Sequence, residues 1–185
     1  METLVVWNKT VFSLLFSLGS ATNVARPFWA LAASFAPYLL TAFFIVFIIS
    51  LRGFKARFYF IALTLLAVVL SAGIATEAVR YFFPSSRPFV EFGLAAPLGH
   101  DGGGSMPSRH MTFLTPLALA LYLAERRGLT RPRAFLWFGA AVLVVGIARI
   151  VLALHYPGDI LAGALIGAAS FLIARKLLPE PAKRA

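Results

Sequence analysis

The sequence predicts an all-α integral membrane protein, and three observations support that fold class. Hydrophobic residues make up 60% of the 185 residues and charged residues only 13%, whereas soluble domains carry about 25% charged residues. The mean hydropathy is +0.85. The apolar residues also lie in long runs, as transmembrane helices require. Because a soluble domain of this size cannot bury so much apolar surface, we exclude a soluble enzyme and a disordered chain. The absence of Cys excludes a disulfide-stapled domain.

Five apolar runs predict a bundle of five transmembrane helices that forms a single membrane-embedded domain over residues 1–185. A helix needs about 20 residues to cross about 30 Å of hydrocarbon. The runs are Phe28 to Leu51, Phe58 to Thr76, Met111 to Ala124, Ala134 to Leu154 and Ile160 to Ala174. The first two are long enough by themselves. The last three reach that length only with the polar residues at their ends, so we expect those polar residues at the membrane surface.

The N-terminal stretch over residues 4–18 is apolar but carries polar residues, among them Asn8, Lys9 and Thr10. This pattern predicts a helix that lies in the membrane interface, and a sixth span is the alternative. A signal peptide is not expected, because the chain starts with Glu2 in place of a basic segment and no cleavage site follows.

The net charge of +10 does not indicate nucleic-acid binding, because the basic residues lie in short clusters between apolar runs. One set comprises Arg52, Lys55, Arg57, Arg126, Arg127, Arg131, Arg133, Arg175, Lys176, Lys183 and Arg184. The smaller set comprises Lys9, Arg26, Arg80, Arg87, Arg109 and Arg149. The positive-inside rule places the larger set in the cytoplasm. We therefore expect the N-terminus and the smaller set outside, and the C-terminus inside.

Three polar groups lie at the predicted outer ends of the spans. They are the segment Arg80 to Pro88, the segment Pro107 to His110, and Arg149 with His155 and Asp159. A helical bundle would bring all three to one pocket. One Arg guanidinium can donate two parallel hydrogen bonds to phosphate oxygens. His together with Asp supplies acid–base chemistry near neutral pH. The groups together therefore predict a phosphate site.

Backbone groups are expected to contribute to the same site. Pro107 suits the first turn of a helix, which would aim the N–H groups of Ser108, Arg109 and His110 at an anion. The glycines at 102–104 would let the backbone approach closely. The alternative is that the Arg residues only anchor lipid head groups. That explanation does not account for Arg149 and His155, which lie inside or beside an apolar run where charge is costly.

The three groups resemble the tripartite signature of the type 2 phosphatidic acid phosphatase superfamily, which reads K-x6-RP, PSGH and SR-x5-H-x3-D. The chain departs from it at three positions, with Arg80 for Lys, Arg109 for Gly and Ala148 for Ser. The segments Arg87 to Val90 and Ser105 to His110 are also similar to those of bacterial undecaprenyl-diphosphate phosphatases.

The resemblance implies a metal-free, cofactor-free phosphoryl transfer in two steps. His155 would attack phosphorus, Asp159 would orient its ring, and His110 would serve first as acid and then as base. The implied phosphate ligands are Arg80, Arg87, Ser108, Arg109 and Arg149. Pro107 and Glu77 would support them, and we predict that Glu77 forms an ion pair with Arg80, three residues on.

The resemblance also implies the substrate, a polyisoprenyl or other lipid phosphate. It favours conversion of undecaprenyl diphosphate to the monophosphate on the outer face of the inner (cytoplasmic) membrane, during carrier-lipid recycling for the cell wall. Alternatives are a phosphatidylglycerophosphate, phosphatidate or lipid A phosphatase, or a non-catalytic lipid-binding protein or transporter. His100 and Asp101 either contact a diphosphate or, the preferred interpretation, only shape their loop. Tyr156 is predicted to pack. Oligomeric state and the preference between monophosphate and diphosphate stay open.

Overall fold

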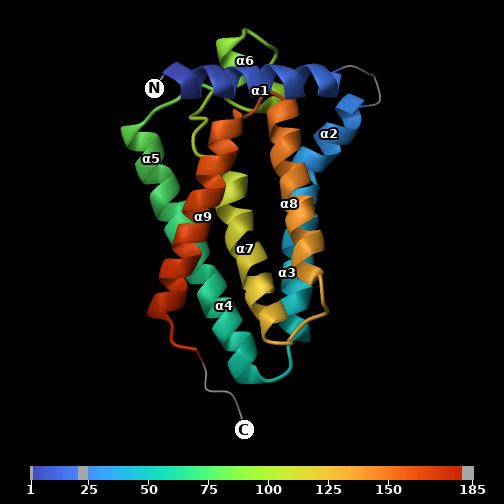
Figure 1. Ribbon diagram of the computed structural model, residues 1–185, viewed down its shortest axis with the longest axis vertical. Helices are drawn as coiled ribbons and strands as arrows, with labels where there is room; N and C mark the ends of the chain where they lie inside the picture. Colours follow the sequence, from blue (N-terminus) through green and yellow to red (C-terminus); the bar gives the residue numbers. More distant parts are fainter. Residues whose placement is uncertain (1, 21–24, 181–185) are drawn as a thin grey trace.

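The computed structural model describes residues 2–20 and 25–180, and every regular element in these ranges is helical (Figure 1). The α-helices are α1 (Glu2–Ser20), α2 (Ala25–Ser34), α3 (Ala36–Ser50), α4 (Phe54–Val68), α5 (Thr76–Phe82), α6 (Pro88–Glu91), α7 (Arg109–Arg126), α8 (Ala134–Val151) and α9 (Pro157–Leu177). A π-helical segment, η1 (Val69–Ala75), joins α4 to α5, and a 3-10 turn, η2 (Pro97–Gly99), precedes α7. The predicted all-α membrane fold class is confirmed.

Among the described residues, three helical stretches are long and apolar enough to cross a membrane: Phe54–Phe82, α8 and α9. The α2–α3 pair, bent by 42°, makes a fourth if the two helices form one span. The bend falls beside Pro37 near the start of α3, where proline cannot supply the N–H that a continuous helix needs. Helix α7 has 18 residues but carries charged residues at both ends. The predicted number of five spans therefore stays a prediction.

Helix α7 lies in the middle of the bundle, with α4, α8 and α9 around it (Figure 1). Two glycines let α9 approach it closely. A Cβ atom on Gly163 would lie 2.7 Å from the Ser108 carbonyl oxygen, and one on Gly167 would lie 2.9 Å from Thr115 Cβ. Small residues four apart allow this backbone contact between membrane helices. The contact places the N-terminal ends of α7 and α9 side by side.

The outer surface of the bundle is apolar, as a surface in contact with lipid must be. Large side chains such as Leu39, Phe43, Leu143, Leu165 and Leu172 are more than half exposed. The larger basic set lies in the α3–α4 turn and the first turn of α4, at the end of α7 and in the α7–α8 loop, and at the C-terminal end of α9, all at one end of the bundle (Figure 1). Two of its members, Lys183 and Arg184, lie outside the described residues.

Helix α1 lies across the other end of the bundle instead of running alongside the long helices (Figure 1). This arrangement favours the interfacial helix over the sixth span. Phe12 is buried and packs against Phe92 and Tyr156, with ring centroids 5.4 and 5.3 Å apart. Asn8 Oδ1 accepts a 2.7 Å hydrogen bond from the Gly158 N–H, at the start of α9. These contacts hold helix α1 against the end of the bundle where α9 begins.

The π-helical segment is held by buried polar side chains that the sequence analysis did not anticipate. Ser71 Oγ donates to the carbonyl oxygens of Ala67 and Thr112, each at 2.8 Å. Thr76 Oγ1 donates to the Ser71 carbonyl oxygen at 2.8 Å and lies 3.2 Å from Thr112 Oγ1. π-Helical turns often occur beside functional sites. Here the contacts tie the helix that carries Arg80 to the first turns of α7.

Candidate active site

A cavity of about 370 Å³ opens at the end of the bundle where α5, α7, α8 and the start of α9 meet. Its lining residues are Arg80, Arg87, His100, Asp101, Gly103, Gly104, Arg109, His110, Arg149 and His155. The three polar groups, far apart in the sequence, therefore meet around one space. Asp159 lies behind His155, and Ser108 is fully buried.

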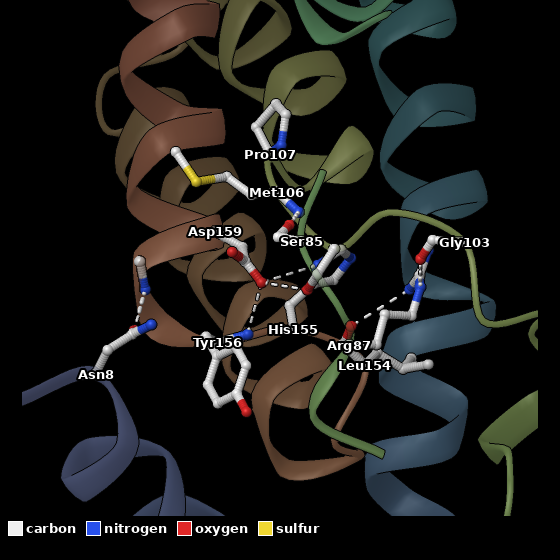
Figure 2. Close-up of polar contacts among 12 residues, drawn as sticks. Asn8, Ser85, Arg87, Gly103, Met106, Pro107, Leu154, His155, Tyr156 and Asp159 are labelled. Atoms are coloured by element: carbon white, nitrogen blue, oxygen red, sulfur yellow. Dashed lines mark hydrogen bonds and ion pairs between the residues drawn. The ribbon is translucent and has the colours of Figure 1, made fainter. Parts of the chain in front are cut away.

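His155 and Asp159 lie side by side in a buried part of this site (Figure 2). His155 is 2% exposed and Asp159 is 4% exposed. His155 Nδ1 lies 3.5 Å from Asp159 Oδ2. The same oxygen accepts hydrogen bonds from Ser105 Oγ at 2.5 Å and from the Tyr156 N–H at 2.8 Å. The carboxylate is thus fixed in front of Nδ1, which leaves Nε2 as the ring nitrogen available to the cavity.

The local chain explains why the pair forms. Helix α8 ends at Val151, and the N–H groups of Leu154 and His155 then donate to the Arg149 carbonyl oxygen. Helix α9 begins at Pro157, so Asp159 is its third residue and caps the helix by accepting a hydrogen bond from the Tyr156 N–H. Burial lowers the pKa of His155 below its usual range, and Asp159 opposes that shift. The His155 imidazole is therefore neutral near pH 7 and keeps a lone pair.

Arg87 is buried and is fixed by main-chain oxygens (Figure 2). Its Nε donates to the Gly103 carbonyl oxygen at 2.8 Å, and its Nη1 donates to the Leu154 carbonyl oxygen at 3.3 Å. Burial lowers the pKa of Arg87, and the Asp101 carboxylate opposes that shift. Arg87 therefore joins the loop before α7 to the residue that precedes His155.

Arg149 lies between two imidazoles. It is 4% exposed; Nη1 lies 3.3 Å from His100 Nε2, and Nη2 contacts His110 Nε2. Because a guanidinium can only donate hydrogen bonds, both Nε2 atoms act as acceptors here, and each ring carries its proton on Nδ1. Within the described residues, Arg149 Nε is buried without a hydrogen-bond partner.

Arg80 reaches the same cavity from α5. Its Nη2 donates to the Pro107 carbonyl oxygen at 3.2 Å, and its aliphatic stem lies beside Gly104. The predicted ion pair between Glu77 and Arg80 is wrong: Glu77 pairs with Arg109. Both partners are more than half exposed, and Arg109 on the facing helix α7 offers the more accessible cation, because Arg80 is turned inward to Pro107.

Two expectations about the start of α7 are also wrong. The helix begins at Arg109 with Ser108 as N-cap, so Pro107 lies before the first turn, next to a cis Met106–Pro107 bond. The Ser108 N–H donates to the Asp159 carbonyl oxygen at 3.0 Å and is therefore not available to an anion. Arg109 and His110 are the first two helical residues, whose N–H groups have no acceptor within the helix. Ser108 Oγ is buried and has no partner among the described residues.

Sequence reasoning assigned no role to Ser105, Asn8 or Glu91. Ser105 is fully buried and fixes Asp159; its place in the segment before Pro107 was the available signal. Tyr156 packs on Phe12 as predicted, and its hydroxyl also donates to Glu91 at 2.5 Å. Glu91 in turn pairs with Lys9 of α1 at 2.5 Å. His100 and Asp101 both line the cavity, so their loop forms part of its wall.

The electrostatics of the cavity suit an anion. Four Arg side chains line it, and Asp101 is the acidic residue among the lining residues that the structure describes. Over the described ranges, no three His, Asp or Glu side chains are grouped so that they could hold a metal ion. Buried guanidinium groups and helix N-terminal N–H groups are the donors that phosphate oxygens require.

Comparisons with known proteins identify the family of the chain. "Putative undecaprenyl-diphosphatase YbjG" of Escherichia coli (strain K12) is 30% identical over 159 residues, 83% of this chain and 75% of that protein. "Bacitracin transport permease protein BcrC" of Bacillus licheniformis is 26% identical over 166 residues, 89% and 77% of the two chains. The crystal structure of Aquifex aeolicus LpxE has a similar fold, with a TM-score of 0.68, 21% identity and coverage of 92% and 95%. A model of the PAP2 superfamily matches residues 61–182. The chain therefore belongs to the PAP2 superfamily.

Proposed function

We propose that this multi-pass membrane protein is a lipid phosphatase that converts undecaprenyl diphosphate to undecaprenyl phosphate and inorganic phosphate. The observation that carries the proposal is the buried His155–Asp159 pair at the wall of a cavity lined by four Arg residues. The E. coli relative is named "Putative undecaprenyl-diphosphatase YbjG", which supports the choice of substrate.

In the proposed first step, the Nε2 lone pair of His155 attacks the terminal phosphorus, and the bond from phosphorus to the bridging oxygen breaks. His110 gives a proton to that oxygen, and the lipid monophosphate leaves. In the second step His110 takes a proton from water, which attacks the phosphohistidine and releases phosphate. Asp159 stabilises the positive charge that His155 acquires.

The Arg side chains bind the transferred phosphoryl group and stabilise its charge in the transition state. Arg149 Nη2 contacts His110 Nε2. When the Arg149 donors turn to phosphate oxygens, this nitrogen becomes free to take up a proton from water, which it then gives to the leaving oxygen. Substrate binding would therefore prepare the general acid. No step in this scheme requires a metal ion.

The charge distribution supports an outward-facing site. The larger basic set gathers at the end of the bundle opposite the cavity, and such sets remain on the cytoplasmic side. The cavity then faces the periplasm or the cell exterior from the inner membrane. A lipid chain can stay in the bilayer while its head group enters a cavity at this depth.

Phosphate release from purified protein tests the proposal. The panel comprises C55 isoprenyl diphosphate, phosphatidylglycerophosphate, phosphatidate and lipid A, each with and without EDTA. We expect the highest kcat/KM on the isoprenyl diphosphate, no loss with EDTA, and no activity in His155→Ala. If another lipid gave the highest kcat/KM, that lipid would be the substrate instead of undecaprenyl diphosphate. Loss of activity with EDTA would contradict the metal-free scheme.

Transport is the second candidate, because the B. licheniformis relative is named a transport permease. A carrier of phosphorylated lipids needs the Arg residues but not a buried His–Asp pair. Lipid movement in vesicles that persists in His155→Ala, with no phosphate released by the unaltered protein, would establish it and overturn the phosphatase.

A further inference from the structure

A third imidazole faces the cavity beside the two that the mechanism uses. His100 lines the cavity and is half-buried, and its Nε2 lies 3.3 Å from Arg149 Nη1. The other terminal nitrogen of the same guanidinium contacts His110 Nε2. Arg149 therefore bridges the two rings, which makes His100 the neighbour of His110.

The in-line geometry of phosphoryl transfer determines which group lies on the side of the cavity near His110 and His100. The nucleophile and the leaving group occupy opposite sides of the transferred phosphorus. His155 attacks from one side, so His110, which protonates the leaving oxygen, marks the other. In a diphosphate, the leaving group itself begins with a phosphate. That second phosphate must therefore lie on the His110 side, where His100, linked to His110 through Arg149, can donate a hydrogen bond from Nδ1.

The charge of Asp101, the acidic neighbour of His100, is shared with a buried guanidinium. The Asp101 carboxylate lies on the Gly103 side of the loop, where a Cβ atom on Gly103 would be 3.5 Å from Oδ1. Its charge acts on Arg87 as well as on His100. The cavity, about 370 Å³, also falls in the range of pockets that enclose whole small-molecule ligands, so it has room beyond the transferred phosphoryl group.

We propose that His100, together with Arg149 Nη1, forms a subsite for the phosphate that leaves with the lipid. This subsite makes the enzyme prefer diphosphates to phosphate monoesters. The inference rests on the proposed phosphatase function and adds the specificity that the three family motifs leave open. His100 acts on the leaving phosphate and not on the transferred one.

His100→Ala and His100→Gln test the subsite, with kcat/KM measured on C55 isoprenyl diphosphate and on phosphatidate. A hydrogen bond to a charged group is worth about 1.5–3 kcal/mol, so His100→Ala should lose roughly 10- to 100-fold on the diphosphate. Its activity on phosphatidate should stay unchanged. Gln keeps a donor and should recover part of the loss. Leu98→Ala, an exposed change in the same loop, is the matched control and should leave both substrates unaffected.

The two substrates separate the inference from a structural role and from the proposed function. An equal loss on both substrates would show that His100 only holds Arg149 in place, which would overturn the subsite and leave the phosphatase intact. Unaltered protein that hydrolyses phosphatidate but no diphosphate would overturn both the subsite and the proposed substrate. A thermal melt of each variant in detergent confirms that a selective loss does not come from unfolding.

Discussion

The two sides of the cavity are held in different ways. On the nucleophile side, Asp159 is fixed by the Ser105 hydroxyl and the Tyr156 N–H, and Arg87 by two carbonyl oxygens. On the opposite side, Arg149 contacts two imidazole rings. Among the described residues, the buried side-chain atoms without a hydrogen-bond partner include Arg80 Nε, Arg149 Nε and Ser108 Oγ, and on the nucleophile side His155 Nδ1, which lies 3.5 Å from Asp159 Oδ2.

This difference separates a part of the site that is fixed by hydrogen bonds within the protein from a part whose buried donors have no acceptor among the described residues. A buried polar group without a partner costs about 1–3 kcal/mol, and a bound phosphate can supply acceptors to such donors. The carboxylate behind the nucleophile is thus held by the protein itself, whereas the phosphate-binding side has donors that the substrate can satisfy. Changes on the rigid side should lower kcat, and changes on the other side should alter substrate binding or choice.

Among changes on the two sides of the cavity, Asp159→Asn should lower kcat the most. Asn can still accept hydrogen bonds from Ser105 and Tyr156, so the fold should survive, but it cannot stabilise a positive His155. We expect kcat to fall by roughly 10³- to 10⁴-fold with KM little changed, as measured by steady-state phosphate release. A KM change without loss of kcat would place Asp159 in substrate binding instead.

Ser105→Ala should have the next largest effect. It removes the 2.5 Å hydrogen bond that fixes Asp159 Oδ2, and kcat should fall by roughly tenfold or more, since hydrogen bonds to charged groups contribute about 1.5–3 kcal/mol. Ser86→Ala, an exposed change in a nearby loop, is the control. Unchanged kcat in Ser105→Ala would show that the Tyr156 N–H alone holds the carboxylate.

Asn8→Ala tests whether α1 supports the rigid side from outside. Asn8 caps the first turn of α9 at Gly158, the residue next to Asp159, and loss of a cap costs about 1 kcal/mol. We expect a lower melting temperature and a severalfold lower kcat. Asn8→Asp keeps the acceptor and should recover both, and Thr10→Ala serves as the matched change on an exposed face of α1. Equal losses in Asn8→Asp and Asn8→Ala would contradict the capping role.

Glu77→Gln should have the smallest effect. The Glu77–Arg109 ion pair is exposed, so it contributes about 1 kcal/mol or less to stability. Freeing Arg109 at the rim of the cavity should lower KM for an anionic lipid slightly and leave kcat unchanged. A large fall in kcat would mean that Glu77 takes part in the chemistry.

The sequence predicted the bundle and the residues of the cavity because hydrophobic run length and motif spacing are local properties. The boundaries of α8 and α9 lie close to the predicted runs, and the three motifs meet at one cavity. The mixed polarity of residues 4–18 also predicted that α1 would lie in the membrane interface, and α1 lies across the end of the bundle. The number of spans is harder to predict from sequence, because the α2–α3 pair is bent and α7 carries charged residues at both ends.

The contacts that orient the site depend on packing between distant segments, which spacing does not reveal. Ser105 meets Asp159 because glycines at 163 and 167 bring α9 against α7. Glu77 pairs with Arg109 instead of Arg80 because the first residue of α7 comes within reach of α5. The Asn8 cap on α9 joins residues 150 positions apart. None of these pairs shares a helix face or a motif.

Detection of the covalent intermediate tests the central claim most directly. The protein is mixed with C55 isoprenyl diphosphate, quenched in alkali within the first turnover and digested, and the modified residue is located by mass spectrometry. We predict a phosphoryl group on His155, absent in His155→Ala and reduced in Asp159→Asn. Turnover with no phosphoryl group on His155, or with one on another residue, would contradict the account.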